Sequence, residues 1–258
     1  MDLSILPIKP LENEDQIDVH PDFFDLNTGS CVCHIGKPKT GKSVIINNLL
    51  MNPNINLIEK LDIVHVYSPT AKSDTTWRFA CDQIPDTIYS SYSDAHLQSI
   101  LDSQMSMSKS CRAKIAIIFD DFLSFHGLNK NSLMFKLASN YRHYGIKLLY
   151  FATQKFKSVP PLLRACIDYA LISKTTNAKE IEDMDFELGS KYDNKFKSLL
   201  SQATNIPYSF LYLKLNSQPA EAFQTFTKKI YTAKSHSYVD VDFPELPEKS
   251  KKDEDDYY

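Results

Sequence analysis

Residues 36–43 read Gly36-Lys37-Pro38-Lys39-Thr40-Gly41-Lys42-Ser43, and they are the strongest indication of the fold in this chain. It matches the pattern G-x-x-x-x-G-K-[ST] of a phosphate-binding loop, or P-loop. The apolar run 31–35 before it predicts a buried strand, and residues 44–50 after it have a helical pattern. The pattern therefore stands in the strand–loop–helix context that a P-loop requires.

Each residue type in the P-loop suits a nucleoside triphosphate. Gly36 and Gly41 allow the backbone N–H groups to approach phosphates closely, and the following helix directs its positive end at them. Lys42 is placed to contact the β and γ phosphates, and the Ser43 hydroxyl is a suitable ligand for Mg²⁺. We therefore expect residues 36–43 to bind ATP and Ser43 to bind Mg²⁺.

Further apolar runs predict the rest of the sheet. Their continuous apolarity is typical of strands covered on both faces, as in parallel sheets with helical crossovers. One crossover helix is expected over residues 131–144, with Gly145 as its C-cap. The fold class is thus α/β, with a mainly parallel central sheet flanked by helices. The runs are 61–67, 114–119, 146–152 and 167–172, and weaker patterns predict helices over 178–188 and 194–202 and an alternating strand over 208–213.

The charge is unevenly distributed along the 258 residues, although the net charge is only −3. Residues 1–28 carry seven acids and one lysine and predict an acidic lead-in that either packs against the body or remains loose. Residues 239–258 carry eight acids and three lysines and predict a disordered tail. Between them we expect one ATPase domain, residues 29–238, with its core at 30–175 and a C-terminal part at 176–238. This body is basic, which suits a polyanionic partner.

Composition also excludes some classes. No apolar run is long enough to span a bilayer and the first residues lack a signal-peptide pattern, so we expect neither a secreted nor a membrane-spanning protein. The five cysteines are odd in number and mostly lie in apolar runs, as buried residues of a reducing compartment do. Neither the cysteines nor the histidines show zinc-ligand spacing, and we assign the histidines no chemistry.

The run 115–121 places two carboxylates at the end of a buried strand. Beside a P-loop, Asp120 is expected to hold Mg²⁺ through water, and Asp121 to orient the attacking water, a role that Glu fills more often. Gln154 ends the next strand, where it could contact the γ-phosphate or the lytic water. The alternatives are an acidic turn for the Asp pair and a polar turn for Gln154.

A succession of motifs between residues 30 and 175 resembles the genome-packaging ATPases of large DNA viruses, of the poxvirus type, which belong to the FtsK–HerA superfamily. Beyond the P-loop these are Tyr67-Ser68-Pro69-Thr70, Ile117-Ile118-Phe119-Asp120-Asp121, Tyr141-Arg142-His143-Tyr144-Gly145-Ile146 leading into Ala152-Thr153-Gln154, and Val159-Pro160-Pro161-Leu162-Leu163-Arg164. The resemblance implies a RecA-like fold, a homo-oligomeric ring with ATP at the subunit interfaces, and translocation of double-stranded DNA into a preformed capsid. It also implies a capsid or portal-vertex partner, and a location in the viral factory of the host cytoplasm and in the virion.

The resemblance further implies an arginine that reaches the ATP of a neighbouring subunit. Arg142 matches its position, and Arg164 is a second candidate; the alternative for each is a surface arginine. Lysines in the loops 155–157 and 125–130 are candidates for DNA phosphate contacts. The alternative is that the charges of these loops are solvated and their aromatic residues cap the core.

Two other functions stay open at this level. A small-molecule P-loop kinase would carry an arginine-rich lid, and no such cluster lies between Asp121 and Arg142. A nucleotide-gated capsid assembly protein without hydrolysis would have a decayed site, whereas Lys42, Ser43, Asp120 and Gln154 are all present.

Overall fold

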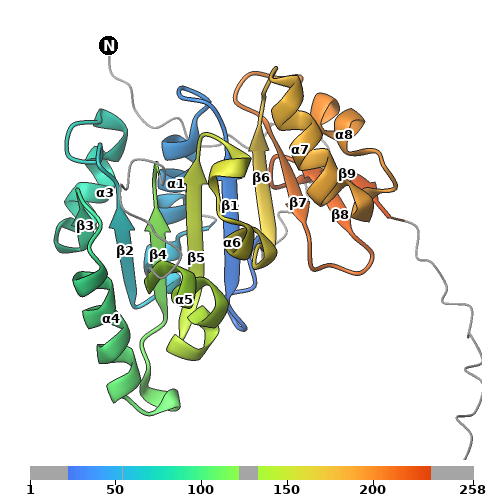
Figure 1. The fold of residues 1–258 in the computed structure, drawn as a ribbon. Coiled ribbons are helices and arrows are strands. Elements are labelled where there is room, and N and C mark those ends of the chain that lie inside the picture. Colours follow the sequence, from blue (N-terminus) through green and yellow to red (C-terminus); the bar gives the residue numbers. More distant parts are fainter. Residues whose placement is uncertain (1–22, 54, 122–132, 234–258) are drawn as a thin grey trace, which may run out of the picture.

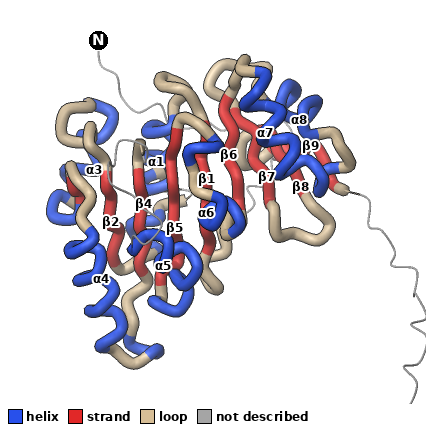
Figure 2. Tube along the Cα trace, viewed as in Figure 1, coloured by secondary structure: helices blue, strands red, loops and turns tan. Residues whose placement is uncertain are grey.

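A nine-stranded sheet connects the described residues, in the order β3-β2-β4-β5-β1-β6-β7-β8-β9 (Figures 1 and 2). The structure is a computed structural model that describes residues 23–53, 55–121 and 133–233. Strands β1 to β6 pair in parallel, and β7, β8 and β9 continue the same sheet antiparallel. The predicted mainly parallel α/β sheet is confirmed, and it extends into the C-terminal part of the chain.

The strands are β1 Ser30–Ile35, β2 Ile63–Tyr67, β3 Ile88–Tyr89, β4 Ile115–Phe119, β5 Ile146–Thr153, β6 Tyr169–Ser173, β7 Phe210–Lys214, β8 Glu221–Gln224 and β9 Lys228–Thr232. The α-helices are α1 Lys42–Met51, α2 Leu57–Lys60, α3 Arg78–Gln83, α4 Asp94–Ser106, α5 Leu133–Asn140, α6 Pro161–Ala165, α7 Ala178–Leu188 and α8 Phe196–Ala203.

Alternate strand residues build two cores, one on each face of the sheet. Along β4, for example, Ile115 and Ile117 lie in one core whereas Ala116 and Ile118 lie in the other, as the two-residue period of a strand requires. Helices α4 to α8 pack on the first face, and α1, α2 and α3 pack on the second (Figure 1). Burial on both faces explains why the parallel strands are apolar throughout.

Most predicted elements lie within a few residues of their expected bounds. The helix expected over 131–144 differs, because α5 ends at Asn140 and a 3₁₀ helix, Tyr141–Tyr144, follows it. Gly145 does cap this segment, with φ +77° and its N–H donating to Arg142 O at 3.2 Å. The strand expected to begin at Tyr208 begins at Phe210, and β3, β8 and β9 were not expected. These three strands are short, and the exposed positions of β9 carry little apolar signal.

Two predicted terminal segments lie mostly or wholly outside the described residues. These are residues 1–22 of the lead-in and the whole tail, 239–258. The described end of the lead-in is packed: Phe23 and Phe24 are buried in the second core, where Phe24 contacts Tyr150 and Tyr212 edge-on. All five cysteines are free thiols. Cys31 and Cys33 are buried as expected, whereas Cys111, which lies between Ser110 and Arg112 outside any apolar run, is exposed.

The described helices are too short or too polar to cross a bilayer.

Candidate active site

The P-loop connects the carboxyl end of β1 to the start of α1. Gly36 N donates to Thr153 O at 3.0 Å, which ties the loop to β5. A β-carbon on Gly36 would lie 2.5 Å from Thr40 Oγ1 and 2.8 Å from Ser173 Oγ, so only glycine fits there. Gly41 has φ +90°, and as the N-cap residue it has no side chain that could cap the first N–H groups of α1. The amino end of this ten-residue helix therefore keeps its donors for an anion.

Lys42 lies at the centre of the loop with its side chain largely buried. Its Nζ donates to Gly36 O at 2.7 Å and to Lys37 O at 3.0 Å. Burial lowers the pKa of Lys42, and the carboxylates of Asp120 and Asp121 oppose that change. The ammonium group is thus held among the loop carbonyls, beside the two acids, where it would meet a bound phosphate chain.

Asp120 follows β4 and is buried among hydroxyl groups. Its Oδ2 accepts hydrogen bonds from Ser43 Oγ at 3.3 Å and from Ser68 Oγ at 3.1 Å. Burial raises the pKa of Asp120, and the two hydroxyl groups and the Lys42 charge oppose that rise. The structure therefore brings the two expected Mg²⁺ ligands, Ser43 and Asp120, together. Ser68 is a contributor that the sequence analysis did not assign, although it directly follows β2 and lies beside Asp120.

Asp121 and Gln154 form a second pair at the same edge of the sheet. Gln154 Nε2 donates to Asp121 Oδ1 at 3.0 Å, although the two residues lie 33 positions apart in the chain. Asp121 has φ +52°, a left-handed conformation that Asp tolerates better than most residues. Such backbone outliers concentrate at functional sites because the surrounding structure must hold them in place.

A buried hydrogen-bond network joins the strands β1, β5 and β6 next to the P-loop. His34, fully buried on β1, lies 2.8 Å from Tyr150 Oη through Nδ1 and 3.3 Å from Ser173 Oγ through Nε2. Burial, together with the Lys42 charge, lowers the pKa of His34 to about 3, so the imidazole is neutral. His34 and Ser173 thus have positioning roles that the sequence analysis missed, because only the fold aligns β1, β5 and β6.

Arg142 lies at the opposite edge of the sheet from the P-loop of its own chain. Its Nη2 donates to both carboxylate oxygens of Asp168, at 3.0 and 2.9 Å, and its Nε donates to Gly29 O at 3.2 Å. Gly29 directly precedes β1, and the P-loop directly follows β1. The six residues of this strand therefore separate Arg142 from the P-loop by about 20 Å. Half of the Arg142 side chain is exposed, so it is open to contact with another molecule.

Arg164 and the loop 155–157 lie on the face covered by α7. Arg164 Nε pairs with Glu187 Oε2 at 2.7 Å, and only 11 % of the Arg164 side chain is exposed. Lys157 Nζ pairs with the same carboxyl group at 2.6 Å, and Phe156 is fully buried. The structure does not bring Arg164 to the P-loop, and Phe156 has the core role that was the alternative for this loop. The other candidate loop, residues 125–130, lies outside the described residues.

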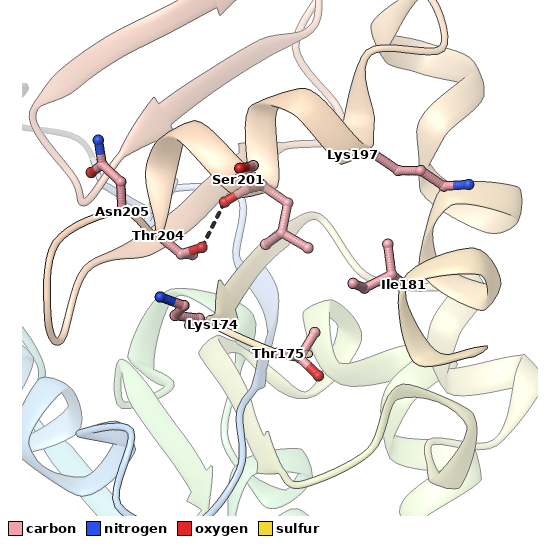
Figure 3. A pocket seen from close by; sticks show the side chains of 8 residues that line it. Lys174, Thr175, Ile181, Lys197, Ser201, Thr204 and Asn205 are labelled. Carbon is pink, nitrogen blue, oxygen red and sulfur yellow. Dashed lines mark hydrogen bonds between the residues drawn. The ribbon is translucent and has the colours of Figure 1, made fainter. Parts of the chain in front are cut away.

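A pocket of about 540 Å³ opens between the β6–α7 connection and α8 (Figure 3). Its lining includes Lys174, Thr175 and Asn205, and no predicted site residue lines it. Lys174 directly follows Ser173, whose Oγ lies beside Gly36, so the pocket lies next to the P-loop. Within the ranges that the structure describes, no group of three or more His, Cys, Asp or Glu side chains is arranged to hold a metal.

Comparisons with known proteins agree with this geometry at the level of the fold. No family model matches the chain. Protein 075L of Invertebrate iridescent virus 6, which is uncharacterized, is 25% identical over 218 residues, covering 82% of this chain and 80% of that protein.

Two solved structures are similar over most of their length. The DNA-packaging ATPase B204 from Sulfolobus Turreted Icosahedral Virus matches with a TM-score of 0.54 and 16% identity, over 78% of this chain and 98% of B204. The genome packaging NTPase B204 from Sulfolobus turreted icosahedral virus 2, in complex with AMP, matches with a TM-score of 0.55 and 18% identity, over 80% of this chain and 100% of that one. The chain therefore has the P-loop NTPase fold of these packaging enzymes, as the sequence resemblance predicted.

Proposed function

We propose that this protein is an ATP-hydrolysing motor that translocates double-stranded viral DNA into a preformed capsid. One observation carries the ATPase part of the proposal. The P-loop, the Ser43–Asp120 contact and the Asp121–Gln154 pair meet at the carboxyl ends of β1, β4 and β5, where parallel sheets bind ligands.

The residues present fit Mg²⁺ bound together with ATP. Ser43 Oγ and Asp120 Oδ2 are hard oxygen ligands 3.3 Å apart, and burial makes a nearby cation favourable for the Asp120 carboxylate. A bound Mg²⁺ would neutralise charge on the β and γ phosphates. Ser68, by donating to Asp120, fixes the orientation of the carboxylate.

Asp121 is the proposed base that orients the attacking water. The amide of Gln154 donates to Oδ1 of Asp121, so it orients the carboxylate at the carboxyl ends of β4 and β5. Asp121 is one methylene shorter than the more usual Glu, and its left-handed backbone, φ +52°, is held in place by the surrounding site. The neutral His34 below the loop adds no positive charge to the site.

Three observations support the DNA-packaging part of the proposal. The motif succession between residues 30 and 175 resembles packaging ATPases, the B204 enzymes share the fold, and the body between the acidic ends is basic. We propose a homo-oligomeric ring in which Arg142 completes the site of a neighbour, with a capsid or portal-vertex protein as partner. The proposed location is the viral factory of the host cytoplasm and the virion.

The test is ATP hydrolysis by the purified protein with and without long duplex DNA. We expect hydrolysis that rises when DNA is added and is lost in Lys42→Ala, whereas the melting temperature without nucleotide stays close to wild type. Lys179→Ala, at an exposed position on α7, is the matched lysine control. Hydrolysis that survives in Lys42→Ala would contradict the site, and hydrolysis indifferent to DNA would contradict the motor.

A further inference from the structure

An exposed tyrosine stands directly beside the P-loop. Tyr208 belongs to the loop between α8 and β7, and 74 % of its surface is exposed. Its ring atom Cδ1 lies 3.6 Å from the point that a β-carbon on Gly41 would occupy, which is van der Waals distance. The ring therefore lies beside Gly41, at the start of the phosphate-binding helix, and most of the residue is exposed.

The backbone that carries this ring is strained. Tyr208 has φ +62°, a left-handed conformation that bulky residues rarely adopt. The turn is held by Ser209, whose N and Oγ donate to Ile206 O at 3.2 and 2.6 Å. The hydroxyl of Tyr208 has no hydrogen-bond partner among the described residues. The ring thus gains little burial from the strained turn that positions it, which points to a ligand as its partner.

The strand order indicates which part of a nucleotide would meet this ring. Asp120 and Gln154, which mark the γ-phosphate end, follow β4 and β5 on one side of β1. Tyr208 precedes β7, which lies on the other side of β1, beyond β6. A triphosphate that extends along the P-loop from the acidic pair therefore directs its nucleoside end toward the β6–β7 side, where Tyr208 stands.

We propose that Tyr208 is the stacking surface for the nucleobase. This inference rests on the proposed function, because it assumes a nucleoside triphosphate in the P-loop. Stacking between a base and an aromatic ring requires an open face of the ring, and it does not require a hydrogen bond from the tyrosine hydroxyl. The ligand class is therefore a nucleoside triphosphate, with purines preferred over pyrimidines because their larger rings overlap more of the tyrosine.

The experiment measures the contribution of the base to binding separately from that of the phosphates. Affinities for Mg·ATP and for Mg-bound inorganic tripolyphosphate, which has no base, are measured for wild type, Tyr208→Ala and Tyr208→Phe. We expect Tyr208→Ala to weaken ATP binding roughly 5- to 100-fold, the equivalent of one stacking contact. Tripolyphosphate binding should be unchanged, and Tyr208→Phe should bind ATP as wild type does. Phe186→Ala, at an 86 % exposed aromatic of α7, is the control and should change neither affinity.

The other outcomes have distinct meanings. Equal weakening of ATP and tripolyphosphate in Tyr208→Ala would mean that the ring supports the P-loop, and it would overturn the inference. Unchanged ATP affinity in that variant would also overturn it. Failure of the wild-type protein to bind either ligand would instead refute the proposed function, and the inference with it.

Discussion

Asp120 and Asp121 are adjacent in the chain, yet their surroundings suit different tasks. Asp120 is buried and accepts from two hydroxyl groups, whereas Asp121 is partly exposed and held by Gln154. We therefore expect Asp121→Asn to reduce hydrolysis at least about a hundredfold while ATP affinity stays near wild type. Asn is a fair replacement because it tolerates the left-handed backbone at this position. Asp120→Asn should weaken both Mg·ATP binding and hydrolysis. The measurement is nucleotide affinity and turnover for both variants side by side. Equal losses of affinity in Asp120→Asn and Asp121→Asn would mean that the metal-binding and water-orienting roles are misassigned.

The burial of Asp120 also predicts a change in stability with pH. Its pKa is raised above 3.8 in the folded state, mainly by burial, so folding disfavours the charged carboxylate. The wild-type protein therefore loses stability as the pH rises from 3.8 through the folded-state pKa, and the loss persists above it. Asp120→Asn is neutral at every pH, so without nucleotide it should melt a few degrees higher than wild type at pH 7. Below pH 3.8 the difference should vanish. Thermal melting across this range is the measurement, with the exposed Asp102→Asn as control; a lower melting temperature for Asp120→Asn at pH 7 would contradict the argument.

At the scale of elements, one carboxylate joins the 3₁₀ helix Tyr141–Tyr144 to the starts of β1 and β6. Asp168 accepts from Cys31 N at 2.7 Å, Tyr141 Oη at 2.7 Å and Arg142, and Asn216 also donates to it. Removing it leaves several buried donors unpaired, so Asp168→Ala should cost roughly 2–4 kcal/mol of unfolding free energy.

Denaturant unfolding measures this cost. Asp183→Ala is the control, because its carboxylate makes only a partly exposed contact with Lys157, 3.7 Å apart, and should cost about 0.5 kcal/mol or less. If both variants lose the same small amount, Asp168 does not join these elements as described.

At the scale of the whole molecule, Arg142 and the P-loop lie at opposite edges of one sheet, too far apart to act in the same subunit. If the site is shared between subunits, Arg142→Lys should bind ATP normally but hydrolyse it about a thousandfold more slowly, because Lys lacks the planar fork of donors. The Lys variant keeps a positive charge beside Asp168, so its melting temperature should stay close to wild type. The less conservative Arg142→Ala is expected to lose stability as well.

Mixing subunits tests the shared site directly. Lys42→Ala subunits lack their own site but retain Arg142, so adding them to Arg142→Lys subunits should restore part of the hydrolysis in mixed rings. Mixed oligomers without recovered hydrolysis would remove the shared-site model and leave Arg142 as the structural partner of Asp168.

The P-loop, the strand-ending acids and the α/β class could be predicted from the amino-acid sequence alone. These are local signals: a glycine-rich loop needs particular residues in order, and a strand buried on both faces must be apolar throughout. Other contacts could not be predicted, because the strand order of the fold brings together residues that lie far apart in the chain. These are the contacts of Ser68 with Asp120, of Gln154 with Asp121 and of His34 with Ser173. The position of Arg142 and the exposure of Tyr208 depend likewise on packing, since an arginine or tyrosine has the same local pattern whether it faces its own core, a neighbour or a ligand.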